Sequence, residues 1–209
     1  MNFTRELVRE YKPQRMLISC NWPGYVCKNV CCDNDREPTC DYAKFDAYLS
    51  QFVNFMLEMR SQGVEVHALA VDINYWNYAP TSLVDADGII DKNIKPFRYS
   101  FFKKMYKTMI EKYEAALNKE KIPMIDITDN FCWEDQCHVI TPKGYAHYLD
   151  CQHVGNNLAR HWMTSLDHLV KFWCYIYLFI FWIESFWEKF LFKVKDYQKY
   201  FLIKWNICW

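Results

Sequence analysis

The sequence has no net charge and very little glycine. Its 209 residues include 25 basic and 25 acidic side chains, but only five glycines. Because nucleic-acid binding relies on an excess of Lys and Arg near the phosphates, the balanced charge excludes nucleic acid as a main partner. The low glycine count, beside ten cysteines, excludes collagen-like and low-complexity classes. The length is typical of one domain.

Aromatic residues are abundant and unevenly distributed. Trp, Tyr and Phe make up 19% of the chain, and 16 of the 41 residues in 169–209 are aromatic. This stretch contains neither glycine nor proline, so its composition differs from that of the rest. We therefore divide the chain into a body, residues 1–168, and a hydrophobic aromatic tail, residues 169–209.

In the body, segments with helical hydrophobic spacing alternate with short apolar runs. The helical spacing occurs in four segments, 2–11, 41–62, 99–117 and 155–163. The short runs, which predict buried strands, occur at 15–21, 64–73 and 122–127. This alternation predicts an α/β fold in which a parallel sheet has helices on both faces.

Open parallel sheets bind ligands beyond the carboxyl ends of their strands, which we expect here at 20–25, 72–78 and 126–130. The middle loop carries Asp72, which is interpreted as a cap or turn residue rather than a cleft residue. The aromatic side chains of Tyr75, Trp76 and Tyr78 anchor this loop or, alternatively, form a platform for a sugar ring. Among the histidines, we expect one in the core, His67, and three at the surface, His138, His147 and His161.

Ten cysteines suggest a disulfide-bonded body. The sequence contains no CxxC pair, which makes a zinc site less favoured than disulfides. Cys132 and Cys137 bracket four residues, a span that a disulfide can close. One or two further bridges could form among Cys20, Cys27, Cys31, Cys32 and Cys40. A zinc site of loop thiols with His138 is the minor alternative, so neither metal nor another cofactor is expected.

Disulfides favour an oxidising compartment, whereas the charged residues 1–11 do not form a signal peptide. We therefore expect the natural protein to extend upstream of this sequence.

Asp150 and His153 form the most informative motif, within YLDCQHVGNNLAR at 148–160. A turn of this length can place the carboxylate against one imidazole nitrogen. That contact fixes the tautomer and leaves the other nitrogen as a general base. On spacing alone, the alternative is a helix N-cap aspartate beside an ordinary histidine.

The order of a buried strand, a Cys-x4-Cys loop, a tyrosine and then D-x-x-H resembles the closing block of SGNH hydrolases. It is most similar to the SGNH domain fused to the C-terminus of acyltransferase-three membrane proteins, where the block reads roughly Y-x-D-x-x-H-L-S-x-x-G-A. Tyr148, Asp150 and His153 match this block. Val154 replaces its leucine, Gly155 its serine, and Leu158-Ala159 its closing Gly-Ala. The resemblance covers about residues 5–162.

The resemblance implies a three-layer, flavodoxin-like parallel sheet that is incomplete at its N-terminus. It implies that His153 is the general base and Asp150 its orienting partner in a Ser-His-Asp triad. The implied activity is that of an O-acyltransferase or esterase acting on acyl groups of carbohydrate hydroxyls. The implied partners are therefore an acyl donor and a carbohydrate-like acceptor.

The nucleophile of such a site should be a serine in a Gly-Asp-Ser block, and this sequence contains no such block. Ser19 and Cys20 lie at a strand end, but a buried strand residue is the simpler interpretation of Ser19. Asn21 lies near the place of an oxyanion asparagine, so we predict it as the oxyanion donor. Without its serine the site has no covalent route, so we expect the domain to be weak or inactive alone.

The tail contains twelve consecutive apolar residues, 172–183, between Lys171 and Glu184. A membrane-spanning helix needs about 20, a length reached here only by including both charges. We expect an aromatic-rich C-terminal helix that serves as a membrane segment or lies in the interface. The competing interpretation is a mispredicted appendix. The membrane interpretation predicts a membrane-associated protein whose domain lies on the extracellular or lumenal side.

Two other functions remain open at this point. One is a non-enzymatic, disulfide-stapled extracellular α/β module that binds carbohydrate or protein. The other is a small thiol- or zinc-dependent protein.

Overall fold

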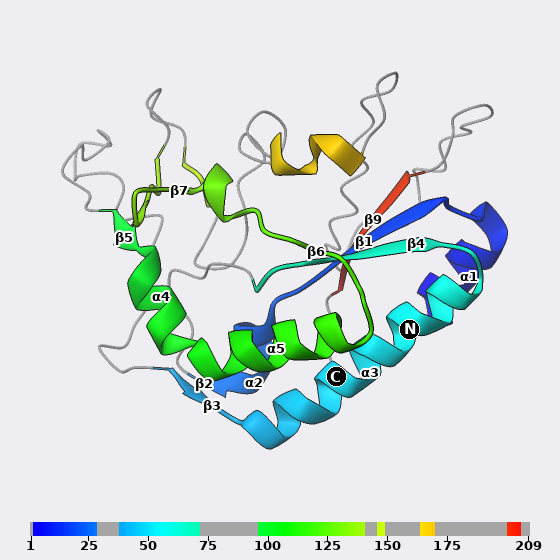
Figure 1. Ribbon diagram of the computed structural model, residues 1–209, viewed down its shortest axis with the longest axis horizontal. Coiled ribbons are helices and arrows are strands. Elements are labelled where there is room, and N and C mark those ends of the chain that lie inside the picture. Colours follow the sequence, from blue (N-terminus) through cyan, green and yellow to red (C-terminus); the bar gives the residue numbers. More distant parts are fainter. Residues whose placement is uncertain are drawn as a thin grey trace, which may run out of the picture.

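A four-stranded parallel sheet forms the centre of the fold (Figure 1). The computed structural model describes residues 2–28, 38–71, 96–140, 146–148, 164–169 and 200–205. In spatial order the strands are β6 (Met124–Ile125), β4 (Glu65–Leu69), β1 (Arg15–Cys20) and β9 (Tyr200–Trp205). The predicted α/β class with a parallel sheet is confirmed at this level.

The central strands form because their sequences are continuous apolar runs. Five of the six residues of β1 are buried, and in β4 every residue after Glu65 is buried. A parallel strand that is covered on both faces has this pattern, whereas a strand with one wet face alternates. The register pairs Ile18 with Ala68 and Ala68 with Met124, so the three body strands stay level.

Five α-helices and two 3-10 helices belong to the described residues. The α-helices are α1 (Asn2–Tyr11), α2 (Trp22–Val26), α3 (Tyr42–Ser61), α4 (Tyr99–Met105) and α5 (Lys107–Lys119). The 3-10 helices are η2 (Thr128–Asn130) and η3 (Thr164–Leu169). Short strands form two small antiparallel sheets: β2 (Cys27–Lys28) with β3 (Thr39–Cys40), and β5 (Phe97–Arg98) with β8 (Gln136–Cys137) and β7 (Cys132–Trp133).

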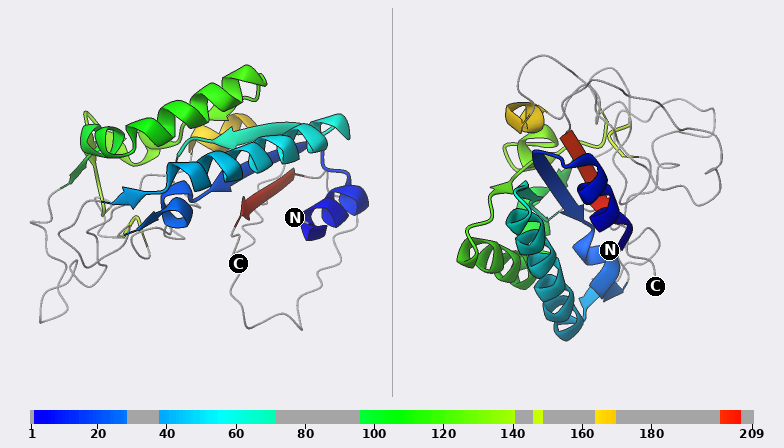
Figure 2. Two further views of the ribbon diagram at one scale, coloured as in Figure 1. Left: turned by 90° about the horizontal axis from the view of Figure 1, so that it is seen from below. Right: turned by 90° about the vertical axis from the view of Figure 1, so that its right-hand side faces the viewer.

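Helices α3 and α5 lie together on one face of the sheet, and η3, coloured gold, lies on the other (Figures 1 and 2). The steps from β1 to β4 and from β4 to β6 run in the same direction along the sheet. Because such crossovers are right-handed, both helices come to the same face. Under them, Trp22 of α2 packs edge-on against Phe45 and Phe52, with ring centroids 5.2 Å away in each case. This aromatic core therefore lies next to the carboxyl end of β1.

The bounds of α3 follow local sequence signals, whereas the break between α4 and α5 does not. Asp41 caps α3 by accepting a hydrogen bond from the Lys44 amide at 2.9 Å, and Gly63, at φ 85°, follows its end. By contrast, the predicted helix 99–117 is divided in two. Tyr106, with φ −105° and ψ 19°, separates α4 from α5. Its ring is fully buried and packs 5.0 Å from that of Phe102, so tertiary packing overrides the helical spacing.

Residues 200–205 of the tail form a strand, which the sequence analysis did not predict. They pair in parallel with β1, from Arg15 opposite Tyr200 to Cys20 opposite Trp205. Aromatic and β-branched residues in YFLIKW favour extended backbone. The apolar run 172–183 lies outside the described residues. Among the residues that are described, no helix combines the length and apolarity needed to cross a bilayer.

Candidate functional site

The carboxyl ends of β1, β4 and β6 meet at one edge of the sheet. Ala70, just after β4, donates its amide to the Ile125 carbonyl of β6 at 2.9 Å, so the two strand ends stay joined. Continuing the register by two residues brings Cys20, Ala70 and Asp126 level with one another. This edge is where an open α/β sheet binds ligands, and it is the candidate site.

Asn21, the predicted oxyanion residue, caps the short helix α2. Its Oδ1 accepts a hydrogen bond from the Gly24 amide at 3.1 Å. A Cβ at Gly24 would lie 2.6 Å from Nδ2 of Asn21, so a larger residue would displace the Asn21 side chain from its cap position. The amide nitrogen Nδ2 is the only donor group of this side chain, so it is the atom that could donate to an oxyanion. The oxyanion role stays a prediction.

Ser19 and Cys20 are poorly placed for nucleophilic attack. Ser19 is 7% exposed and Cys20 is 4% exposed, and both belong to the covered strand β1. A nucleophile must reach the substrate carbonyl, which a side chain this deeply buried does not do. The interpretation of Ser19 as a buried strand residue is confirmed.

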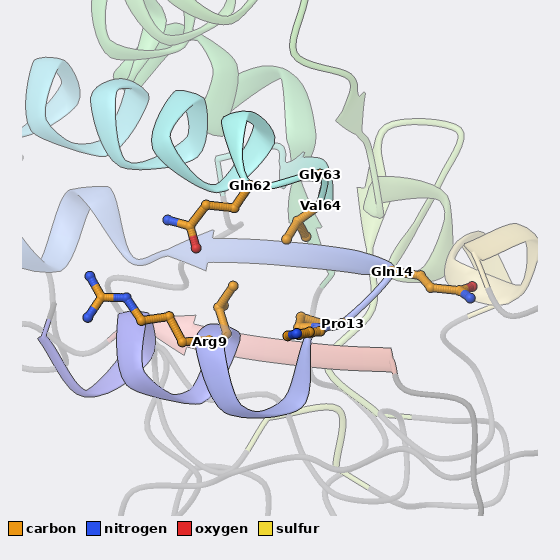
Figure 3. Close-up of a pocket in the computed structure, with 8 residues that line it drawn as sticks. Arg9, Pro13, Gln14, Gln62, Gly63 and Val64 are labelled. Carbon is orange, nitrogen blue, oxygen red and sulfur yellow. The ribbon is translucent and has the colours of Figure 1, made fainter.

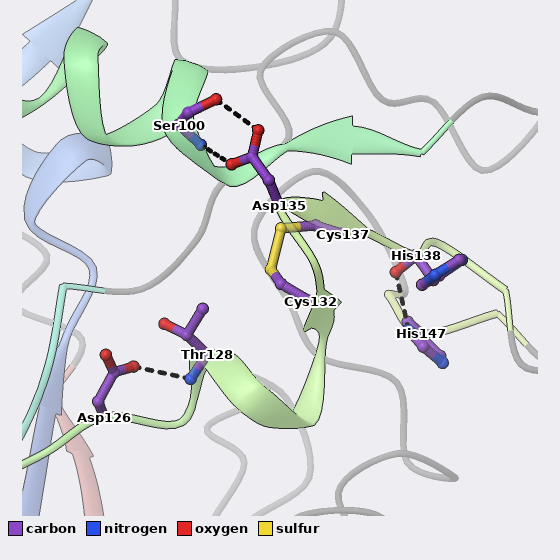
Figure 4. Close-up of a disulfide and its surroundings, with 8 residues drawn as sticks. All are labelled: Ser100, Asp126, Thr128, Cys132, Asp135, Cys137, His138 and His147. Atoms are coloured by element: carbon purple, nitrogen blue, oxygen red, sulfur yellow. Dashed lines mark hydrogen bonds between the residues drawn. A yellow bond between two sulfur atoms is a disulfide. The ribbon is translucent and has the colours of Figure 1, made fainter.

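Asp126 shapes the loop that follows β6 (Figure 4). Its Oδ1 accepts a hydrogen bond from the Thr128 amide at 2.8 Å, the local contact with which aspartate starts a turn. Thr128 is buried and hydrogen-bonds to Tyr99, whose pKa is raised by burial. The turn leads into η2 and then to Phe131, which is 5% exposed.

The predicted Cys132–Cys137 disulfide is confirmed, and it closes a tight hairpin. The two central residues, Glu134 and Asp135, have φ values of 45° and 70°. Two consecutive positive φ angles are typical of the two-residue turn that matches strand twist, although Asn and Gly are its usual residues. The disulfide therefore holds a turn whose sequence does not favour it.

Asp135 connects this hairpin to helix α4. Its carboxylate accepts hydrogen bonds from the amide and the hydroxyl of Ser100, at 2.5 and 2.6 Å (Figure 4). The N-cap residue of α4, Arg98, supplies no side-chain cap, so Asp135 fills that role from another part of the chain. The Ser100 hydrogen bonds, aided by Arg98 and Lys103, hold the pKa of Asp135 below its ordinary value.

Of the four histidines discussed above, three are described. His147 is 7% exposed, so its predicted surface position is wrong, whereas His138 is exposed and His67 is buried as predicted. His147 Nδ1 lies 2.8 Å from the His138 carbonyl, which can only accept, so Nδ1 carries the proton. Burial lowers the pKa of His147, which therefore stays neutral near pH 7. Nε2 of His67 lies 2.9 Å from Glu65.

Asp150 and His153 lie outside the described residues, but both flanks of their segment are described. On one flank the Tyr148 ring packs against Phe131, with centroids 5.5 Å apart. On the other flank, Thr164 Oγ1 accepts a hydrogen bond from Asn130 Nδ2 at 3.1 Å. The flanking residues are therefore both attached to two consecutive residues of the loop after β6.

A second disulfide joins Cys27 of β2 to Cys40 of β3. It is one of the bridges that the sequence left open, and Cys20 takes part in neither disulfide. Cys31, Cys32, His161, Asp72 and the aromatic loop 75–78 lie outside the described residues. Within the described ranges, no group of three or more His, Cys, Asp or Glu side chains could hold a metal ion.

Sequence reasoning did not identify Asp135 as a helix cap. The turn position of Glu-Asp within CWEDQC was visible, but its partner Ser100 is 35 residues away and gave no signal. The fold and the two disulfides among the described residues define the class as a disulfide-bonded α/β protein. A scan against models of protein families and a search of curated proteins found no match to this chain.

Proposed function

We propose that this chain is an SGNH-like domain related to enzymes that move acyl groups to or from carbohydrate hydroxyls. One observation supports this most directly. Tyr148, just before the Asp150–His153 pair, and Thr164, the first described residue after it, both contact the loop after β6. That loop is at the carboxyl edge of the parallel sheet, the edge at which such folds carry out chemistry.

In the proposed mechanism, His153 is the general base and Asp150 orients its imidazole. His153 takes the proton of the attacking hydroxyl, and Asp150 stabilises the imidazolium that results. Asn21 Nδ2 is the proposed donor to the oxyanion. Since the sequence holds no Gly-Asp-Ser block and Ser19 is buried, the pair can activate only water or an acceptor hydroxyl directly. The proposed activity of this chain alone is therefore weak.

Hydrolysis of 4-nitrophenyl acetate tests this proposal. We expect slow turnover by the full chain that is reduced about tenfold or more in His153→Gln, since general-base catalysis contributes roughly 10²–10⁴-fold. His138→Gln is the matched control, because His138 is an exposed histidine of the adjacent loop. Equal rates for the full chain and His153→Gln would refute the role of His153. Fast turnover that His153→Gln abolishes would refute the inference that this chain lacks its nucleophile.

The second candidate is a non-enzymatic extracellular module, and one observation favours it. Trp133 is 74% exposed, and Gln136 lies opposite both Trp133 and Arg98 in the small sheet. Residues directly opposite in antiparallel strands share a face, so an indole, an amide and a guanidinium form one exposed row. Such planar groups suit a sugar ring. Loss of polysaccharide binding in Trp133→Ala, with esterase activity absent throughout, would favour this module.

Two further parts of the proposal concern location. The two disulfides support an extracellular or lumenal position for the domain. Membrane association is proposed through the tail, whose apolar run supplies the hydrophobic surface. Fractionation of cells that express the full chain tests both the location of the domain and the membrane association. The lysines of the tail are left unchanged in this experiment.

A further inference from the structure

A cavity of about 490 Å³ opens at the opposite edge of the sheet from the candidate site (Figure 3). It lies between the C-terminal ends of α1 and α3, where β1 and β4 begin. Its lining residues are Val8, Arg9, Lys12, Pro13, Gln14, Gln62, Gly63 and Val64. The volume is within the roughly 300–1,000 Å³ typical of small-molecule sites.

The facing turns of α1 and α3 leave Arg9 without an ion pair among the described residues, although its charge helps to lower the pKa of Glu58. Arg5 of α1 forms a bidentate ion pair with Glu58 of α3, with Nη2 and Oε2 2.7 Å apart. One helical turn further along both helices, the corresponding residues are Arg9 and Gln62. Their side chains extend toward the same side of the cavity (Figure 3). A cation thus meets a neutral amide where the preceding turn has a carboxylate.

The lining as a whole is positive. It includes two cations, Arg9 and Lys12, and no acidic residue. Neither cation belongs to an ion pair among the described residues. Two helix C-termini point here, and each contributes roughly −0.5 of an elementary charge. Those partial charges offset about half of the two positive charges.

One backbone carbonyl at each of these helix ends is already engaged. The Val8 carbonyl accepts a hydrogen bond from the Lys12 amide at 2.9 Å, and the Arg60 carbonyl accepts one from Gly63 at 3.0 Å. They therefore compete little for the cations, which remain available to a ligand. The walls also include buried apolar side chains, among them Val8 and Val64, each 4% exposed.

We propose that this cavity binds a small organic anion, a carboxylate or phosphate joined to a compact apolar body. Arg9 and Lys12 bind the anionic group, the Gln62 amide donates to it, and Val8 and Val64 contact the apolar body. The six residues of β1, about 20 Å of strand, separate this cavity from the carboxyl edge. Binding here is therefore independent of the proposed acyl chemistry.

Calorimetric titration of the full chain tests the site with benzoate, phenyl phosphate and the neutral isostere benzamide. We expect both anions to bind and benzamide to bind at least about tenfold more weakly. A charged hydrogen bond contributes roughly 1.5–3 kcal/mol, or about tenfold to a hundredfold in affinity. Arg9→Gln with Lys12→Gln should weaken both anions by at least about tenfold. The control, Lys104→Gln with Lys119→Gln, removes the same charge from exposed positions of α4 and α5 and should leave binding unchanged.

A second variant keeps the test decisive if the double variant does not fold. Gln62→Glu places a carboxylate opposite Arg9, as Glu58 stands opposite Arg5, so it should fold and compete with the anions. We expect it to weaken benzoate and phenyl phosphate by about tenfold. The proposal is overturned if the full chain binds neither anion, if benzamide binds as tightly as benzoate, or if Gln62→Glu binds them unchanged. None of these outcomes depends on esterase activity.

Discussion

Removal of the Cys132–Cys137 disulfide tests how the hairpin is held. The perturbation is Cys132→Ala with Cys137→Ala. The cysteines are five residues apart, so the bond closes a short loop. Chain entropy predicts that losing this closure costs about 2 kcal/mol at 25 °C. Cys137 is fully buried, so the missing sulfur adds a further packing loss of up to roughly 1 kcal/mol.

The second disulfide supplies an internal comparison. Cys27 and Cys40 are 13 residues apart, and the same entropy relation gives about 3 kcal/mol for the larger loop. Both sulfurs there are half-buried, so packing contributes less. The two double variants should therefore lose similar stability in urea unfolding. They should differ locally, because the Cys132→Ala, Cys137→Ala variant alone should lose amide-exchange protection in α4.

That difference follows from Asp135, which caps α4 from the turn that the disulfide closes. A free-energy loss below about 0.5 kcal/mol for Cys132→Ala with Cys137→Ala would contradict the account of the hairpin. Unchanged exchange protection in that variant at Tyr99 and Ser100, whose amides donate to Asp135, would contradict the coupling to α4.

Two further predictions concern Gly24, in the helix that follows β1, and Glu65, the first residue of β4. Gly24→Ala should destabilise the fold by about 1 kcal/mol in urea unfolding, because its Cβ would displace the Asn21 cap. The loss should be smaller in an Asn21→Ala background, and an equal loss would refute the clash. Glu65 has a lowered pKa because of Arg15 and then His67, so its contribution is present above pH 4.5 and is lost as pH falls through its folded-state pKa. Glu65→Gln should therefore weaken the acid dependence of stability below pH 4.5, and an unchanged profile would count against that ion pair.

The sheet was predictable because its strands carry a local signal. Residues 15–20 and 65–69 are apolar runs in the sequence and central strands in the structure. The Cys132–Cys137 pair was predictable from spacing, because the four intervening residues form a loop that a disulfide can close. The SGNH fold remains part of the proposal above.

The errors concern features that depend on distant residues. His147 is buried because an antiparallel bridge between Ile140 and Ala146 brings it beside His138, and that pairing has no composition signal. The interruption at Tyr106 depends on burial of its ring. The cavity between α1 and α3 depends on how two helices far apart in the sequence are aligned, so Arg9 and Gln62 did not stand out.

The most direct test of the central claim is the protonation of His153 in solution. We propose an NMR titration of the imidazole in the full chain and in Asp150→Asn. If Asp150 orients His153, the carboxylate favours the imidazolium, so its removal should lower the pKa of His153 by about one unit. An unchanged His153 pKa would show that the two side chains do not interact and would contradict the proposed general base.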